Sequence, residues 1–132
     1  MEVGYVEGQN VGVEFLWAEG QYERLPAMAA ELVARQVTVT ATIGGIPSAL
    51  AAKAATSVIP IVFSVAEDPV GRGLVASLAR PGGNATGISF LSVELDRKRL
   101  ELLREVMPNA AVIAVLLNPK NLQAETQARG IE

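Results

Sequence analysis

Residues 37–65 read VTVTATIGGIPSALAAKAATSVIPIVFSV and contain a complete strand–helix–strand unit. Residues 37–43 are dense in β-branched residues with apolar character on both faces, which is typical of a buried parallel strand. Gly44-Gly45 ends this strand, residues 47–58 have a helical composition, and residues 61–65 form a second short apolar strand. The order favours a parallel sheet, because parallel neighbours need a crossover between them.

The same alternation continues on both sides of this unit. We expect further strands at 11–17, 86–91 and 110–117, and further helices at 22–36, 70–79 and 92–107. The connections are short, and no internal repeat or low-complexity tract interrupts the order. The sequence therefore predicts an α/β, doubly wound, mostly parallel sheet of about five strands with helices on both faces.

Composition excludes several classes of function. The chain has 132 residues, of which 50% are hydrophobic and 19% are charged, so we expect a folded domain with its own core. A net charge of −3 predicts neither nucleic-acid binding nor binding to an anionic membrane surface. With no Cys and no His, the chain has no thiol nucleophile, imidazole base, iron–sulfur site or His-ligated metal. We therefore expect no catalytic residues, no metal and no cofactor.

The carboxyl ends of parallel strands form the usual ligand crevice of such a sheet. Four of these ends carry polar or Gly-rich sequence, at 42–48, 64–69, 90–92 and 118–119. In the first, two glycines precede the N-terminus of a helix, an arrangement that can hold a carboxylate or phosphate. A tight turn between strand and helix explains the same glycines, and the sequence favours this simpler interpretation over an anion site.

Single polar residues at the other strand ends also leave two interpretations. Asp68 could bind a ligand ammonium group, or it could cap the segment that follows. Glu67 precedes it, but adjacent side chains point apart, so the pair does not predict acid–base catalysis. Asn118 could contact a polar ligand group or only start a turn before Pro119.

Known phosphate-binding and hydrolase motifs are absent. Gly71-Arg-Gly73 lacks the third glycine of the dinucleotide fingerprint, and Gly44-Gly45 is not followed by the Gly-Lys-Ser/Thr of a P-loop. No Gly-x-Ser-x-Gly sequence occurs. An enzyme is therefore the least favoured class.

Three phrases carry a family resemblance: GYVEGQN at 4–10, DPVG at 68–71 and RPGGNATG at 80–87. Together with the intervening sequence they resemble the bacterial ABC-transporter substrate-binding proteins of the group that includes tryptophan- and tyrosine-binding members. The resemblance covers nearly the whole chain, apart from the last dozen residues.

The resemblance implies a type I periplasmic-binding-protein fold, in which two similar flavodoxin-like lobes close on a small-molecule solute. It also implies import without catalysis, an ABC permease as partner and a periplasmic or other extracytoplasmic location. By position, it implies ligand-binding roles for Gly44, Gly45, Ile46, Pro47, Ser48, Asp68, Pro69, Phe90, Ser92 and Asn118.

The chain departs from the family in length. Members are about twice as long and begin with a signal peptide, which is not found before Val3, followed by a strand and a helix. We expect residues 1–108 to form an N-terminal lobe without its first strand, and residues 109–132 to be the first strand and the start of a helix of the second lobe. Half of a ligand site should bind weakly.

Residues 110–117 therefore need a partner strand. One hypothesis places them in the vacant central position of the same sheet, and the other pairs them with a second copy in a swapped homodimer. We expect a solute-binding fragment of an ABC import system. The alternative is a structural, self-associating domain that has lost ligand binding.

Overall fold

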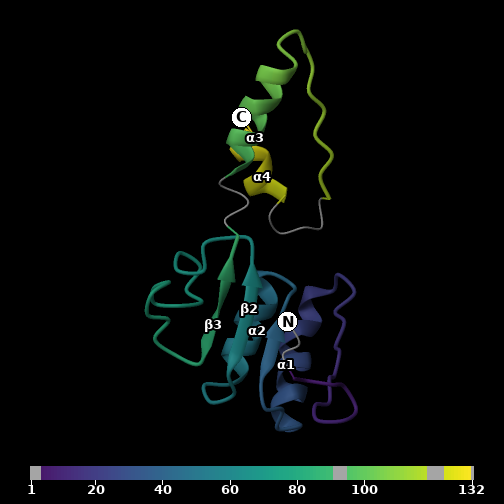
Figure 1. Ribbon diagram of the computed structural model, residues 1–132, viewed down its shortest axis with the longest axis vertical. Helices are drawn as coiled ribbons and strands as arrows, with labels where there is room; N and C mark the ends of the chain where they lie inside the picture. The colour runs from purple at the N-terminus through teal and green to yellow at the C-terminus, as the bar shows by residue number, and fades with distance from the viewer. Residues whose placement is uncertain (1–3, 91–94, 119–123, 132) are drawn as a thin grey trace.

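The computed structural model describes residues 4–90, 95–118 and 124–131 of the chain. Within this part, three strands lie side by side, α2 lies behind them and α1 lies beside α2, while α3 and α4 lie together at the other end of the molecule (Figure 1). The fold is α/β and parallel, as the sequence predicts.

The sheet has the order β1-β2-β3 in the described residues. Its strands are β1 (Thr40–Thr42), β2 (Ile61–Val65) and β3 (Ala85–Ser89). Both pairs are parallel, with Thr40 opposite Ile61 and Ile61 opposite Ala85. Sequence-adjacent strands are thus neighbours in space, and their carboxyl ends meet at one edge.

One face of this sheet packs on α2 (Ile46–Ala55), which in turn packs on α1 (Leu25–Ala34). A single 3-10 turn, η1 (Tyr22–Arg24), leads into α1. Small side chains on α2, such as Ala49 and Ala52, allow the helix to approach the buried side chains of β2 closely. The helices predicted at 22–36 and 47–58 are confirmed within a few residues.

The opposite face of the sheet is exposed, because no described helix covers it. Val62 and Ile88 point to this face and are 46% and 57% exposed. The prediction of helices on both faces is therefore wrong for the described structure. The physical reason is that α3 (Asp96–Val106) packs against α4 (Ala124–Ile131) instead of crossing back over the sheet.

Residues 70–79 form turns and irregular structure, not the predicted helix. Two glycines weaken helix formation here, and Gly73 adopts φ +71°, which a helix does not allow. The segment is held by tertiary contacts instead. Leu74 and Val75 are buried in the core, and Lys53 Nζ donates hydrogen bonds to the carbonyl oxygens of Gly73 (2.8 Å) and Leu74 (3.0 Å).

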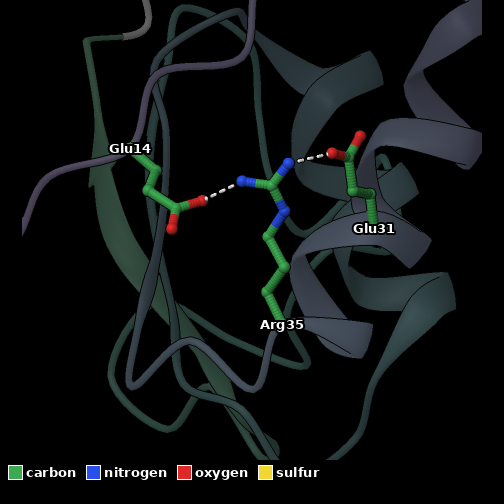
Figure 2. Close-up of polar contacts among 3 residues, drawn as sticks. All are labelled: Glu14, Glu31 and Arg35. Atoms are coloured by element: carbon green, nitrogen blue, oxygen red, sulfur yellow. Dashed lines mark hydrogen bonds and ion pairs between the residues drawn. The ribbon is translucent and has the colours of Figure 1, made fainter.

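The segment 11–17 forms no ladder, so the strand predicted there is wrong. Val11 makes an isolated bridge with Glu7. Further along the segment, Glu14 is held by a side chain at the end of helix α1 and not by a neighbouring strand. Arg35, at the end of α1, donates to Glu14 at 2.6 Å and also to Glu31 (Figure 2). An alternating pattern predicts a strand but does not supply a neighbour for it.

Residues 110–117 also lie outside the sheet (Figure 1). The hypothesis that they occupy a central position in the same sheet is wrong, and the count of about five strands falls to three in the described residues. Joining the sheet would require α3 to lie on its open face, which it does not. Pairing of this segment with a second copy is not tested by a single chain.

Candidate functional site

A cleft of about 970 Å³ opens at the carboxyl edge of the sheet. Three loops and one distant residue line it. They are the turn before α1 (Glu19–Tyr22), the start of α2 (Gly44–Pro47 and Leu50), the loop after β2 (Glu67, Gly71 and Arg72), and Asn118. The volume lies in the range of pockets that hold small organic molecules.

The start of α2 faces the cleft with its backbone. Gly45 precedes the helix at φ +80°, a conformation that favours glycine, and no side chain caps the helix. The Ser48 hydroxyl donates to the Gly45 carbonyl oxygen at 2.8 Å, so it does not use the first N–H groups of α2. Of these, Ile46 and Ser48 keep an N–H, since Pro47 has none. The tight-turn and anion-site interpretations of Gly44-Gly45 are therefore compatible in one structure.

The loop after β2 carries two carboxylates, Asp68 and Glu67, and it is Glu67, not the expected Asp68, that lines the cleft. Asp68 accepts hydrogen bonds from the N–H groups of Val70 (2.9 Å) and Gly71 (3.0 Å), so it caps the turn that follows. It does not line the cleft, whereas Glu67 does. Of the two interpretations of Asp68, the structure therefore supports the capping residue and not the ligand-binding residue.

The other candidates divide between the cleft and the rest of the molecule. Gly44, Gly45, Ile46, Pro47 and Asn118 come together in the cleft lining, as expected for residues at strand ends.

The remaining candidates do not line it. Pro69 is fully buried, and Phe90 is 60% exposed and outside the cleft. Ser48 supports the backbone at Gly45 instead of facing the cleft. Ser92 lies outside the described residues.

Sequence reasoning missed the Glu19–Tyr22 turn, Leu50 and the pair Gly71-Arg72. The turn follows the segment 11–17, so the strand-end rule would have included it if applied there. Glu67 was considered only as a partner of Asp68 in acid–base catalysis, and not as a ligand-binding residue of its own. The argument that adjacent side chains point apart would have placed Glu67 in the cleft once Asp68 was assigned to the turn.

Two side-chain oxygens in the described structure are buried without a hydrogen-bond partner, Thr42 Oγ1 and Glu67 Oε2. Thr42 ends β1, and Glu67 follows the end of β2, so both lie at the carboxyl edge of the sheet. The other acid of the cleft, Glu19, is paired with Arg24 at 3.4 Å.

No described helix is both long and apolar enough to span a membrane. Within the same residues, no group of three or more acidic side chains is arranged to hold a metal ion.

Comparisons with known proteins find relatives in both sequence and structure. The tyrosine-binding protein of Clostridioides difficile is 36% identical over 125 residues, which cover 94% of this chain and 35% of that protein. A conserved domain protein of Vibrio cholerae has a crystal structure that is similar with a TM-score of 0.79 and 36% identity, over 97% of this chain and 42% of that one.

Two further solved structures are similar. An ABC domain from Streptococcus pneumoniae in complex with L-Trp has a TM-score of 0.72 and 28% identity, over 92% of this chain and 41% of that one. The ligand-free, open structure of a substrate-binding protein with adhesive properties from Clostridium difficile has a TM-score of 0.69 and 33% identity, over 97% of this chain and 42% of that one. The chain thus spans less than half the length of each of these relatives.

The family comparison covers almost every residue. Residues 1–131 match the family described as ABC transporter substrate binding protein. The predicted family resemblance is confirmed. The chain belongs to the ABC transporter substrate-binding protein family.

Proposed function

We propose that this chain forms part of the solute-binding site of an ABC import system and takes a small amino-acid-like solute at the carboxyl ends of its strands. The cleft of about 970 Å³ at that edge is the observation that carries the proposal. The names of two relatives, one tyrosine-binding and one in complex with L-Trp, support an aromatic amino acid as the solute class.

The chemistry of the cleft suits such a solute. The carboxylate of the solute lies at the N-terminus of α2, where uncapped N–H groups and the positive end of the helix dipole favour an anion. Tyr22 and Leu50 supply apolar surface in the same cleft for the side chain of the solute.

The proposal includes wider assignments, which family membership supports. Residues 1–108 belong to the N-terminal lobe, and residues 109–132 to the beginning of the second. The partner for transport is an ABC permease, and the location is periplasmic or otherwise extracytoplasmic.

Isothermal titration calorimetry of the chain with L-tryptophan, L-tyrosine and branched amino acids tests the proposal. We expect binding with a Kd of about 0.1–1 mM, since a cleft from one lobe encloses a ligand only partly. No heat at millimolar ligand would remove solute binding by this chain.

A pair of variants on α2 ties any binding to the cleft. Leu50→Glu adds a negative charge in the lining and should weaken binding of a carboxylate solute at least tenfold. Ala54→Glu adds the same charge at an exposed position of α2 outside the lining and should leave the Kd unchanged. Equal effects of the two variants would place the solute elsewhere.

A second candidate is a self-associating structural domain without ligand binding. The observation that favours it is exposed apolar surface, since Val112 is 86% exposed and Leu116 is 100% exposed. Sedimentation velocity that shows a stable dimer, together with silent calorimetry, would support this candidate over the first.

A further inference from the structure

We propose that Glu67 binds the ammonium group of the solute, and so selects zwitterionic amino acids over the corresponding carboxylic acids. The inference rests on the proposed function of the cleft. In that proposal the N-terminus of α2 binds the carboxylate of the solute, and Glu67 is now assigned to its ammonium group.

The first support is the state of the Glu67 carboxylate. It lines the cleft, and its Oε2 atom is buried without a hydrogen-bond partner among the described residues. A buried carboxylate oxygen without a donor is unfavourable, because its lost hydration is not replaced. A cationic N–H donor from a bound solute supplies the missing partner.

The second support is that no cation or hydrogen-bond donor of the described residues satisfies this oxygen. Arg24 pairs with Glu19 at 3.4 Å, and the amide donors of the next turn, Val70 and Gly71, bond to Asp68. Arg72 lines the same cleft but does not bond to Oε2 of Glu67. Of the two acids in the described cleft lining, Glu67 is the one with a buried oxygen that lacks a donor.

The third support is the rigidity of the backbone at this residue. The Ser89 hydroxyl donates to the carbonyl oxygen of Glu67 at 2.8 Å, which ties the end of β2 to the end of β3. The turn closed by Asp68 fixes the next residues. Because the backbone here is already fixed, only the side-chain torsions of Glu67 remain to be ordered when it binds a donor.

The cleft is thus complementary to a zwitterion. The N-terminus of α2 attracts the carboxylate, and Glu67 attracts the ammonium group. A carboxylic acid without the amine would leave Oε2 of Glu67 without a partner, and sites that lose a partner in this way reject such analogues strongly.

The test compares two ligands on three proteins by calorimetry. The ligands are L-tryptophan and 3-(indol-3-yl)propionate, which differ only in the amino group. The proteins are the wild-type chain, Glu67→Gln, and Glu23→Gln as a control that removes the same charge at an exposed position outside the cleft.

We expect the wild-type chain to bind L-tryptophan about 10- to 100-fold more tightly than the propionate. Glu67→Gln should lose this preference by weakening the binding of L-tryptophan by the same factor, with the propionate unaffected. Glu23→Gln should behave as the wild type does.

The outcomes separate this inference from the proposed function. Wild-type protein that is silent to both ligands overturns the proposed function and the inference with it. Wild-type protein that binds both ligands equally overturns the inference alone, and this result does not depend on any variant folding. Unchanged preference in Glu67→Gln, with a thermal melt matching the wild type, also overturns it.

Discussion

Gly87 in the middle of β3 is a residue whose identity is dictated by one close contact. A Cβ atom built there would lie 2.0 Å from the Phe63 carbonyl oxygen and 2.7 Å from atoms of the Phe63 ring. Both distances are far shorter than van der Waals contact. Glycine is a poor strand former, so its presence here reflects the approach of β2 and not local preference.

Gly87→Ala should therefore lower the free energy of unfolding by about 3 kcal/mol or more, because backbone in the sheet must move to admit a methyl group. Gly83→Ala is the matched control, since nothing lies within 4 Å of its added Cβ. Urea denaturation of both variants measures the difference. Equal midpoints for the two would contradict the contact.

Asp68 is a second residue whose role is local, since its side chain caps the turn after β2. Asp68→Ala should cost about 1 kcal/mol of stability, since two backbone N–H groups lose their acceptor. Asp68→Asn keeps one oxygen acceptor and should cost less. Neither change should alter the Kd for a solute, because Asp68 does not line the cleft. Loss of solute binding without loss of stability would show that Asp68 binds ligand.

At the scale of the elements, the N-terminal segment is joined to α1 by side-chain contacts and not by strand pairing. Arg35 on α1 bonds to Glu14 on the unpaired segment and to Glu31 on its own helix (Figure 2). The hydrogen bond with Glu14, and then that with Glu31, raises the pKa of Arg35 above its ordinary value. All three side chains are about half exposed, so the contact positions the segment more than it stabilises the fold.

Glu14→Gln should loosen the segment while the melting temperature stays nearly unchanged. Trp17 lies in this segment, stacked on Phe15 with ring centroids 6.1 Å apart, and it is the single Trp of the chain. Its fluorescence anisotropy should fall in Glu14→Gln and stay constant in Glu23→Gln. An unchanged anisotropy in both would show that the ion pair does not restrain the segment.

Helix α3 contains a pH-dependent pair. The hydrogen bond and charge of Lys98 lower the pKa of Glu101 below its ordinary value. A lowered pKa in the folded state means that the contribution is complete above the unfolded pKa and is lost as pH falls through the folded one. The helicity of α3 should thus be insensitive to pH near neutrality and decrease in acid.

Carbon-13 NMR titration of the Glu101 carboxyl group checks this prediction. The expected pKa of Glu101 is below the ordinary value for a glutamate side chain. Lys98→Met keeps the aliphatic stem and should return the pKa of Glu101 toward its ordinary value. A pKa unaffected by that change would exclude Lys98 as the cause.

At the scale of the whole molecule, the described residues include two exposed apolar surfaces. One is the sheet face that carries Val62 and Ile88, and the other is the segment 110–117. Apolar surface of this kind favours association with another surface. The exposed backbone groups of an unpaired segment favour addition to a sheet edge.

Val112→Ser combined with Leu116→Ser should therefore reduce any dimer seen by sedimentation velocity, with the dissociation constant rising at least tenfold. Val58→Ser is the control, since Val58 is 82% exposed in the loop between α2 and β2 and belongs to neither surface. A dimer that persists in the double variant would assign association to the sheet face or elsewhere.

The parallel core is the part that the sequence predicts well. Strand 61–65 has the predicted bounds, and β3 and α2 begin within one residue of prediction. In these elements the local pattern and the tertiary contacts agree, because each buried apolar residue faces α2 or a neighbouring strand. The Gly-Gly turn before α2 is likewise predicted, and it carries part of the cleft.

Only the tertiary structure decides which segments find partners and which carboxylate faces the cleft. Residues 11–17 and 110–117 have strand patterns, yet no described strand pairs with either, since a pattern specifies faces and not neighbours. The same holds for Glu67 and Asp68, which are adjacent in sequence. The turn after β2 uses Asp68 as its hydrogen-bond acceptor and thereby leaves Glu67 at the cleft.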